Sequence, residues 1–411
     1  MRSSKIVSSG KSVASSALLQ VRVAHLITSL NIGGAEQQMK QLVLANKGDR
    51  PEPHLVISMT DNGPIGEELR RAGVRVLTLG IPRGQPTLSG LFRLWRLLRQ
   101  LRPEVLHCWL YHGCLLGVVA GRMARTPQVV WSLQSANKDL ASYRFQTRLV
   151  VRLCAFLSCF VDAIVPNSEV GRALHERWGY SGSRMRVIPN GIDLNVFKPD
   201  PTAYVEVREE LGIRNDTTLL GLFARYHPMK DHATFLRAAQ IIVSRTANVQ
   251  FLLAGEGITA NNAELSGMLE EYRLQRVVHL LGARADIPRL TAALDVACLS
   301  SWSESAPFVV CEAMACGLPC VVTNVGDAPR MVGDTGIVVP VRDSDALAEA
   351  LNRMLVMSTV QRAALGQRAR KFALEHYSLE RTVSAYQALY ARTPGIWTVR
   401  DQKSVTHAPT S

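Results

Sequence analysis

The sequence predicts an α/β protein in which two doubly wound parallel sheets, one in each of two domains, face each other across a cleft. Short apolar runs rich in β-branched residues alternate with helical patterns along almost all of the 411 residues. These runs are continuously hydrophobic, which is typical of strands covered by helices on both faces. The alternation pauses after the segment VIPNGID, so the chain divides into two series.

The first series contains six predicted strands, connected as expected for right-handed βαβ units. They cover residues 21–27, 54–59, 74–79, 104–109, 128–133 and 163–168. A helix is predicted from Ala35 to Leu44, after a glycine-containing loop. Residues 1–20 are basic and rich in serine but lack a convincing signal-peptide core. We therefore expect a flexible N-terminal tail and a cytoplasmic protein.

The second series adds six strands, at residues 219–223, 250–254, 277–281, 296–300, 319–323 and 336–339. We place the domains at residues 21–195 and 196–377, with a last helix, 378–392, that returns to the first domain. Residues 393–411 are expected to form a second flexible tail. Tandem sheets of this class bind ligands at the carboxyl ends of their strands, so the cleft is the predicted site.

Composition narrows the class of partner. A net charge of +13 favours an anionic substrate or surface. No recognised nucleic-acid-binding motif is present, so nucleic acid is not expected as a partner. No uncharged apolar stretch is long enough for a transmembrane helix.

The eight cysteines contain no C-x-x-C pair, and most of them lie in apolar runs. This pattern indicates buried thiols in a reducing compartment rather than a metal site.

Two segments that follow the first strand of each series carry groups suited to phosphate. In NIGGAE, Gly33 and Gly34 would let backbone N–H groups approach a phosphate, or would simply form a tight turn. In FARYHPMKDH, Arg225 and Lys230 stand five residues apart on a strand-to-helix loop. Two such cations can hold a diphosphate, although a solvated surface pair would look the same. Asp231 is expected to cap the following helix.

Two further segments carry carboxylates and a turn. In WSESAPFVVCEAMACGLP, Glu304 lies in a loop after a strand and Glu312 lies in a helix that Gly317 ends. Carboxylates there suit vicinal sugar hydroxyls, whereas the alternative is a capping residue and a helix-surface glutamate. The turn in VIPNGID connects the domains, and that role alone could explain it.

Together, in this order, these segments resemble the retaining GT-B glycosyltransferases of family 4, formerly called group 1. The resemblance covers roughly residues 21–390, and its most specific parts are VIPNGID, ARYHPMKDHATFLRAA, LLAGEG, LLGARADIPRL and the spacing of Glu304 and Glu312. It implies two Rossmann-like domains, the first for the acceptor and the second for the donor. It also implies transfer of a sugar from a nucleotide-diphosphate donor to an acceptor hydroxyl, with retention and without cofactor or metal.

The resemblance also assigns roles to residues. Arg225 and Lys230 would contact the diphosphate, Glu304 would lie near the transferred sugar, and Glu312 would bind the ribose hydroxyls. Arg284 would lie near the nucleobase and contact it mainly through its backbone. The predicted donor-binding residues also include Gly33, Gly34, Ser305, Ala306, Pro307 and Phe308.

The sequence departs from the family in the first domain. Many members have a histidine at the end of the strand that here runs into Gln134 and Ser135. His112, predicted in a loop after the preceding strand, is a candidate to face the acceptor, against a plain structural histidine. The missing histidine also leaves an alternative, in which the protein binds a sugar nucleotide without transferring the sugar.

A basic helix suggests where the acceptor comes from. The segment LFRLWRLLRQLRP, residues 91–103, has arginines at 93, 96, 99 and 102 beside an apolar face. It is either an ordinary packed helix or one that also contacts an anionic membrane, and the two are compatible. Arg144, Arg148 and Arg152 add to this basic domain. Because family members often extend lipid-linked glycans for surface polysaccharides, we expect a lipid-linked acceptor and a peripheral position on the inner face of the plasma membrane.

Overall fold

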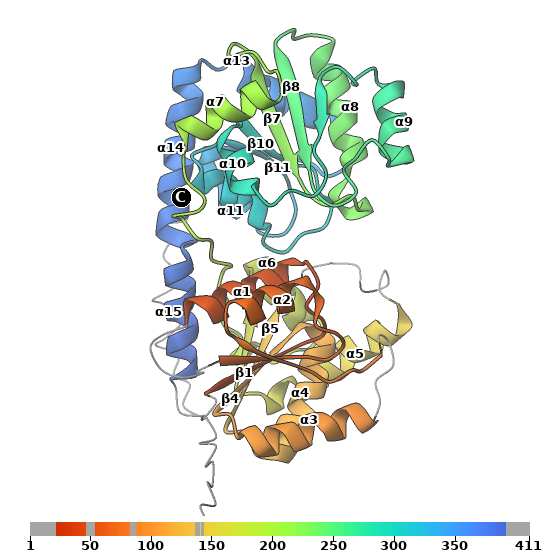
Figure 1. Cartoon of the computed structure of the whole chain (residues 1–411), viewed down its shortest axis with the longest axis vertical. Coiled ribbons are helices and arrows are strands. Elements are labelled where there is room, and N and C mark those ends of the chain that lie inside the picture. Colours follow the sequence, from red (N-terminus) through yellow and green to blue (C-terminus); the bar gives the residue numbers. More distant parts are fainter. Residues whose placement is uncertain (1–21, 47–53, 83–87, 136–139, 141–143, 392–411) are drawn as a thin grey trace, which may run out of the picture.

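The computed structural model describes residues 22–46, 54–82, 88–135, 140 and 144–391, and Figure 1 shows two domains stacked along the long axis. Both predicted tails lie outside the described residues. Each domain contains a six-stranded parallel sheet. All twelve predicted strands occur, with ends shifted by two residues at most. The predicted α/β class is therefore confirmed.

The first sheet has the strand order β3-β2-β1-β4-β5-β6. Its strands are β1 (Val23–Ile27), β2 (His54–Ser58), β3 (Arg75–Thr78), β4 (Val105–Trp109), β5 (Gln128–Leu133) and β6 (Ala163–Pro166). The helices around it are α1 (Gly34–Ala45), α2 (Gly63–Arg71), α3 (Leu88–Leu101), α4 (Leu110–Ala124), α5 (Phe145–Leu157) and α6 (Glu169–Arg177). Val23 of β1 pairs in parallel with His54 on one side and with Val105 on the other, so the winding reverses between β1 and β4.

The second sheet repeats this arrangement with the order β12-β11-β10-β7-β8-β9, so its winding reverses between β7 and β10. Its strands are β7 (Thr218–Phe223), β8 (Val249–Ala254), β9 (Val278–Leu280), β10 (Val296–Leu299), β11 (Cys320–Thr323) and β12 (Gly336–Val339). Its helices are α7 (Pro201–Glu210), α8 (His232–Val243), α9 (Ala263–Glu271), α10 (Ile287–Ala292), α11 (Phe308–Ala315), α12 (Ala328–Val332), α13 (Ser344–Val356) and α14 (Thr359–His376).

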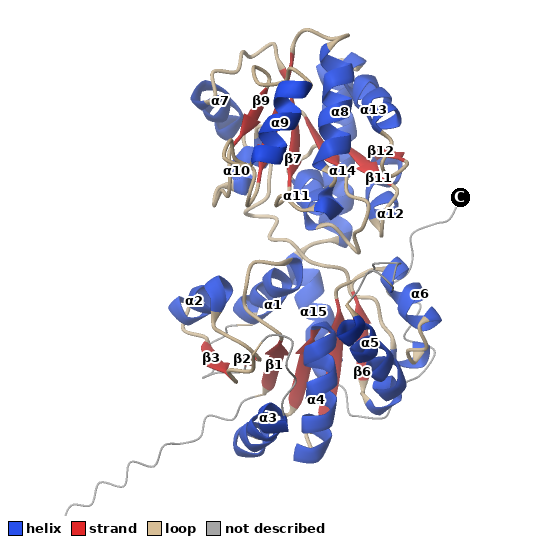
Figure 2. Ribbon diagram, turned by 90° about the vertical axis from the view of Figure 1, so that its right-hand side faces the viewer, coloured by secondary structure: helices blue, strands red, loops and turns tan. Residues whose placement is uncertain are grey.

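Helices cover both faces of each sheet, which explains why the strands are continuously apolar. On the first sheet, α3, α4 and α5 pack through residues such as Leu94, Cys114 and Val151. The opposite face receives α1, α2 and the last helix, α15 (Leu379–Tyr390). Figure 2 shows α3, α4 and α5 in front of the first sheet. None of the helices in the described parts of the chain combines the length and hydropathy needed to span a membrane.

The last two helices run along both domains, as Figure 1 shows at the left. Helix α14 packs against α11 of the second domain, whereas α15 packs against α1 of the first. At the crossing, the Ile192 N–H donates to Tyr377 O at 2.9 Å, and the Leu379 N–H donates to Ile192 O at 2.9 Å. Gly191 lies so close that a Cβ there would come within 2.8 Å of Leu379 Cα. The VIPNGID turn is therefore held against the chain that returns to the first domain.

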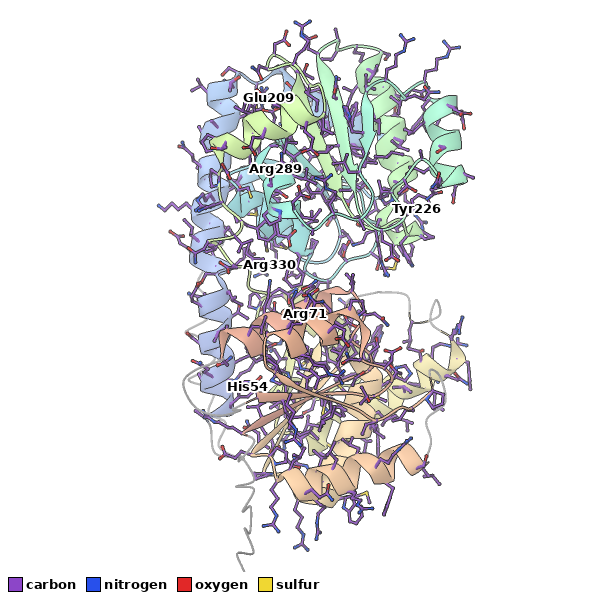
Figure 3. The ribbon with its side chains drawn as sticks, viewed as in Figure 1. His54, Arg71, Glu209, Tyr226, Arg289 and Arg330 are labelled. Atoms are coloured by element: carbon purple, nitrogen blue, oxygen red, sulfur yellow. The ribbon has the colours of Figure 1, made fainter. Side chains whose placement is uncertain are left out.

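A buried polar network fastens α15 to the first sheet. His107 Nδ1 lies 2.7 Å from the Tyr390 hydroxyl, and its Nε2 lies 2.8 Å from Ser132 Oγ. His25 Nε2 lies 2.9 Å from Nδ1 of His54, which Figure 3 labels in the lower domain. Burial lowers the pKa of His25, His54 and His107, and brings that of His54 to about 4. The three imidazoles are therefore neutral in the folded protein at neutral pH.

This network should make stability depend on pH. An unfolded histidine takes up a proton near pH 6.5, whereas His54 in the folded protein stays neutral down to about pH 4. Stabilisation is therefore complete above pH 6.5 and is lost as the pH falls toward 4. We expect the thermal unfolding midpoint to fall by about 4 °C or more between pH 7 and pH 5.

The His54→Gln variant should show a flatter pH dependence in the same scan, because it removes one of the titrating groups. His376→Gln is the matched control. Burial lowers the pKa of this imidazole too, but its side chain on α14 is 33% exposed, so we expect a smaller flattening. Equal pH dependence in wild type and His54→Gln would contradict this account.

Candidate active site

A cavity of about 450 Å³ lies between the two domains, at the carboxyl ends of both sheets. Its walls include the segments that follow β1 and β4 in the first domain and β7 and β10 in the second, which are the positions where the winding reverses. Doubly wound sheets bind ligands at this position. The first-domain wall consists of Gly34, Ala35, Glu36, Leu110, Gln134, Asn167 and Asn190. The second-domain wall consists of Phe223, Lys230, Glu304, Ser305, Ala306, Pro307, Phe308, Val309 and Glu312.

An ion pair between Lys230 and Glu304 lies in the second-domain wall. Lys230 Nζ donates to Glu304 Oε1 at 2.5 Å, and Ser301 Oγ donates to the same oxygen at 2.8 Å. The side chains are 23% and 13% exposed, so the pair is largely shielded from water. Two of the predicted site residues, separated by 74 positions, are thus in direct contact.

The turn that carries Lys230 is held from the neighbouring strand. Ser300 Oγ donates to Lys230 O at 2.7 Å, and the Trp302 indole N–H donates to Pro228 O at 2.9 Å. Asp231 follows with a left-handed φ of 52°, and its carboxylate accepts from the Thr234 N–H at 3.2 Å. The predicted helix cap is therefore present, and the lysine stands on a well-supported turn.

Helix α11 directs its N-terminus at the cavity. Pro307 is its N-cap, and among the described residues no side chain caps the backbone N–H groups of the first turn. Such groups carry partial positive charge and attract anions. Glu312 follows within this helix and lines the cavity. Burial raises the pKa of Glu312 to about 7, so its charge changes close to neutral pH.

The first-domain wall contains polar residues that the sequence analysis did not assign to the site, and Glu36 and Gln134 are two of them. Glu36 lies in the first turn of α1, and burial raises the pKa of its carboxyl group. A backbone hydrogen bond and the charge of Arg225 oppose this effect. Gln134 follows β5, and its Nε2 is buried without a hydrogen-bond partner among the described residues. The sequence signal that could have identified Glu36 is an acidic residue in the first turn of a helix that begins at paired glycines.

Polar contacts join the two domains beside the cavity. Ser305 Oγ donates to Asn167 Oδ1 at 2.6 Å and lies 2.8 Å from Ser168 Oγ. Asp327 accepts from the backbone N–H groups of Glu169 and Val170, at 2.9 and 3.0 Å, and so caps α6 of the other domain. Figure 3 labels Arg330, three residues further on, at the boundary between the domains. Ser305 therefore has a contact role in addition to its place in the cavity wall.

Four predicted site residues lie outside the cavity wall. Gly33 is the N-cap of α1, and Arg225 follows β7 without lining the cavity. His112 is not in a loop: α4 begins directly after β4, at Leu110 with a φ of 63°, so His112 lies in the first helical turn. The Arg284 guanidinium donates to Asp286 at 2.7 Å, so the side chain is engaged, and a backbone contact to a base stays a prediction.

Family models match both domains. Residues 32–196 match the model of glycosyltransferase family 4, and residues 217–356 match that of the group 1 glycosyl transferases. The chain belongs to this glycosyltransferase family. The cavity lies between the two matched segments, and residues of both line it.

Relatives in sequence agree with this membership, and a solved structure agrees with the fold. EpsF of Bacillus subtilis, which bears the name of a glycosyltransferase, is 27% identical and spans 90% of this chain and 96% of its own. A UDP-Gal:α-D-GlcNAc-diphosphoundecaprenol α-1,3-galactosyltransferase of Escherichia coli is 26% identical, over 65% of this chain and 70% of its own. Anabaena HepE in complex with UDP has a TM-score of 0.79 at 24% identity, covering 90% of this chain and 99% of its own. The expected GT-B fold is therefore confirmed.

The Asp327 contact should hold the glycosyltransferase domains together. In Asp327→Ala the Glu169 and Val170 amides lose a charged acceptor, so we expect their hydrogen exchange to quicken by about tenfold or more. The radius of gyration from X-ray scattering should rise. Asp334→Ala is the matched control, because this acid on the same domain has a side chain 83% exposed. Unchanged exchange in Asp327→Ala would show that the contact does not hold the domains.

Proposed function

We propose that this glycosyltransferase moves a sugar from a nucleotide-diphosphate donor to an acceptor hydroxyl, with retention of the anomeric configuration. The observation that carries the proposal is Lys230, held 2.5 Å from Glu304 in the cavity wall that also contains the N-terminus of α11. A cation and a helix N-terminus, directed at one cavity, form a site for a diphosphate.

The reaction follows from the charges in the cavity. The bond between the anomeric carbon and the diphosphate oxygen breaks, and its electron pair leaves with the diphosphate. The acceptor oxygen forms the new bond to the anomeric carbon, and its proton passes to the departing phosphate oxygen. Lys230 stabilises the leaving group, with Arg225 adding positive charge nearby, and the reaction needs no metal ion. Water is kept out by the opposing domain, which limits hydrolysis.

The other wall residues divide the donor among them. Glu312 accepts hydrogen bonds from the ribose hydroxyls, and Glu304 lies beside the transferred sugar, with the backbone from Ser305 to Phe308 close to it. Gly34 approaches from the first domain. Gln134 offers a buried amide without a partner among the described residues, at the position where many family members have histidine. We assign Gln134 to the sugar in place of that histidine.

The proposed acceptor is a lipid-linked glycan that is extended for a surface or exopolysaccharide. Two observations support it. The Escherichia coli relative is named for an acceptor carrying diphosphoundecaprenol. The exposed arginines of α3 give the first domain a basic surface, as an anionic membrane requires. The enzyme would then work at the inner face of the plasma membrane.

Incubation with a panel of labelled nucleotide-diphosphate sugars and polyprenyl-diphosphate-linked acceptors tests this function. We expect one donor to give a glycosylated lipid product whose anomeric configuration, read by NMR, equals that of the donor. EDTA should leave turnover unchanged. Binding of a sugar nucleotide with no transfer to any acceptor would favour the alternative, a binding protein without transferase activity.

Lys230 and Glu312 should affect different kinetic parameters. Lys230→Ala should lower kcat by a factor of about 10² to 10³, because it removes a donor that acts on the leaving group. Glu312→Ala should mainly raise the donor Kd, measured by calorimetry. Arg353→Ala is the control, since it removes a cation from the exposed side of α13. Wild-type rates in both folded variants would show that the site is wrongly assigned.

Gln134→Ala tests the contribution of the first domain. The nucleotide diphosphate alone should bind with unchanged affinity, because Gln134 is assigned to the sugar and not to the nucleotide. Transfer should slow by about tenfold, the effect of one lost hydrogen bond to the sugar. Gln134→His should keep more activity than Gln134→Ala if both residues contact the same hydroxyl. Equal rates for wild type and Gln134→Ala would remove this residue from the site.

A further inference from the structure

Helix α5 is apolar on its inner and its outer side. Val151 and Cys154 are buried against the first domain. On the outer side, Phe145 is 72% exposed, Leu149 is 49% exposed and Phe156 is 75% exposed. Their spacing of four and seven residues puts them on one face of the helix. Leu153, and Phe160 in the short helix that follows, extend this exposed apolar surface.

The helices around this face carry positively charged side chains and no negatively charged ones. Figure 2 shows α5 beside α4 and α3 on one side of the sheet. The three helices contain six arginines and no aspartate or glutamate. The arginines are Arg93, Arg96, Arg99, Arg122, Arg148 and Arg152, of which Arg122 is paired with Asp162 at 2.7 Å. The Arg148 guanidinium lies 5.8 Å from the centre of the Phe145 ring, so charge and apolar surface meet on the same helix.

We propose that the outer face of α5 docks on an anionic lipid bilayer. Phe145, Leu149 and Phe156 enter the boundary between headgroups and acyl chains, while Arg148 and Arg152 contact lipid phosphates. A helix with exposed aromatic and leucine side chains flanked by arginines has the composition of an interfacial helix. This inference deepens the proposed function and rests on it for the lipid-linked acceptor.

The position of α5 connects this surface to the cavity. Gln134 lines the cavity at the end of β5, and Phe145 begins α5 eleven residues later. Since α5 runs back along the sheet, its first turn lies at the same edge as the carboxyl ends of the strands. A bilayer on this face would therefore present a lipid-linked sugar close to the cavity.

Charge argues against a second copy of the chain as the occupant. A symmetric contact would put the same surface of both copies together. The arginines of α3 and α5 would then face arginines, without an acid on either helix to compensate. An anionic surface has the complementary charge instead.

Vesicle sedimentation tests the proposal with the full chain. Wild type should bind vesicles of equal phosphatidylglycerol and phosphatidylcholine, and bind pure phosphatidylcholine much less. The triple variant F145S/L149S/F156S should bind the anionic vesicles about tenfold more weakly or worse, because burial of three apolar side chains is lost. The R148Q/R152Q variant should bind the anionic vesicles more weakly, and the binding that remains should depend less on salt concentration.

The matched control is V356S/V360S, which removes exposed apolar side chains, 75% and 78% exposed, from the second domain. It should bind vesicles as wild type does, and circular dichroism and thermal melts should show that all variants are folded. Anionic vesicles bound equally by wild type and by the triple variant would overturn the proposal. A concentration-dependent dimer of wild type, absent in the triple variant, would also overturn it in favour of self-association.

Transfer to a water-soluble acceptor analogue, measured on the same proteins, separates this inference from the proposed function. Turnover of the soluble acceptor without vesicle binding would refute the docking surface alone. Vesicle binding without turnover of any donor would refute the proposed function and leave the surface in place. The triple variant should keep its rate on the soluble acceptor, because none of its three positions lines the cavity.

Discussion

Both sheets reverse their winding at the same relative position, and this constraint places most of the charged groups of the cavity. Loops that follow β1 and β4 leave the first sheet in opposite directions, as do those that follow β7 and β10. Each reversal opens a crevice at the carboxyl ends of the strands. The two crevices face each other, so backbone from α1 and charged side chains from the second domain reach one volume.

Within that volume, the Lys230 ammonium is held in place by the Glu304 carboxylate. A largely shielded lysine without a counter-ion would be costly, and the contacts of Glu304 with Lys230 and Ser301 offset part of that cost. The Lys230 ammonium has three N–H donors, so hydrogen-bonding capacity is left for an incoming phosphate oxygen. The same cavity contains Glu312, whose buried carboxyl has a pKa of about 7. Hydroxyl donors of a ligand would stabilise its ionised form.

The domains are held close by contacts of two kinds. Helix α15 is fixed to the first sheet by apolar packing and by the His107–Tyr390 hydrogen bond. Beside the cavity the contacts are few and polar, through Ser305 and Asp327. Interfaces of this second kind separate more readily than apolar ones. Few polar contacts beside the cavity are consistent with a cleft that opens to exchange donor and product.

By itself, the sequence determined the twelve strands, the cap at Asp231 and the placement of Lys230, Glu304 and Glu312 directly after strands or in the helix that follows. These features depend on local periodicity and on residues near each other in the chain, which a pattern can report. The tertiary structure alone decided that Lys230 pairs with Glu304, and that Gln134 lines the cavity while His112 does not. It also decided that α5 keeps an apolar face outside the core. Each of these depends on contacts between residues far apart in sequence, and a one-dimensional pattern does not specify which groups meet or which remain uncovered.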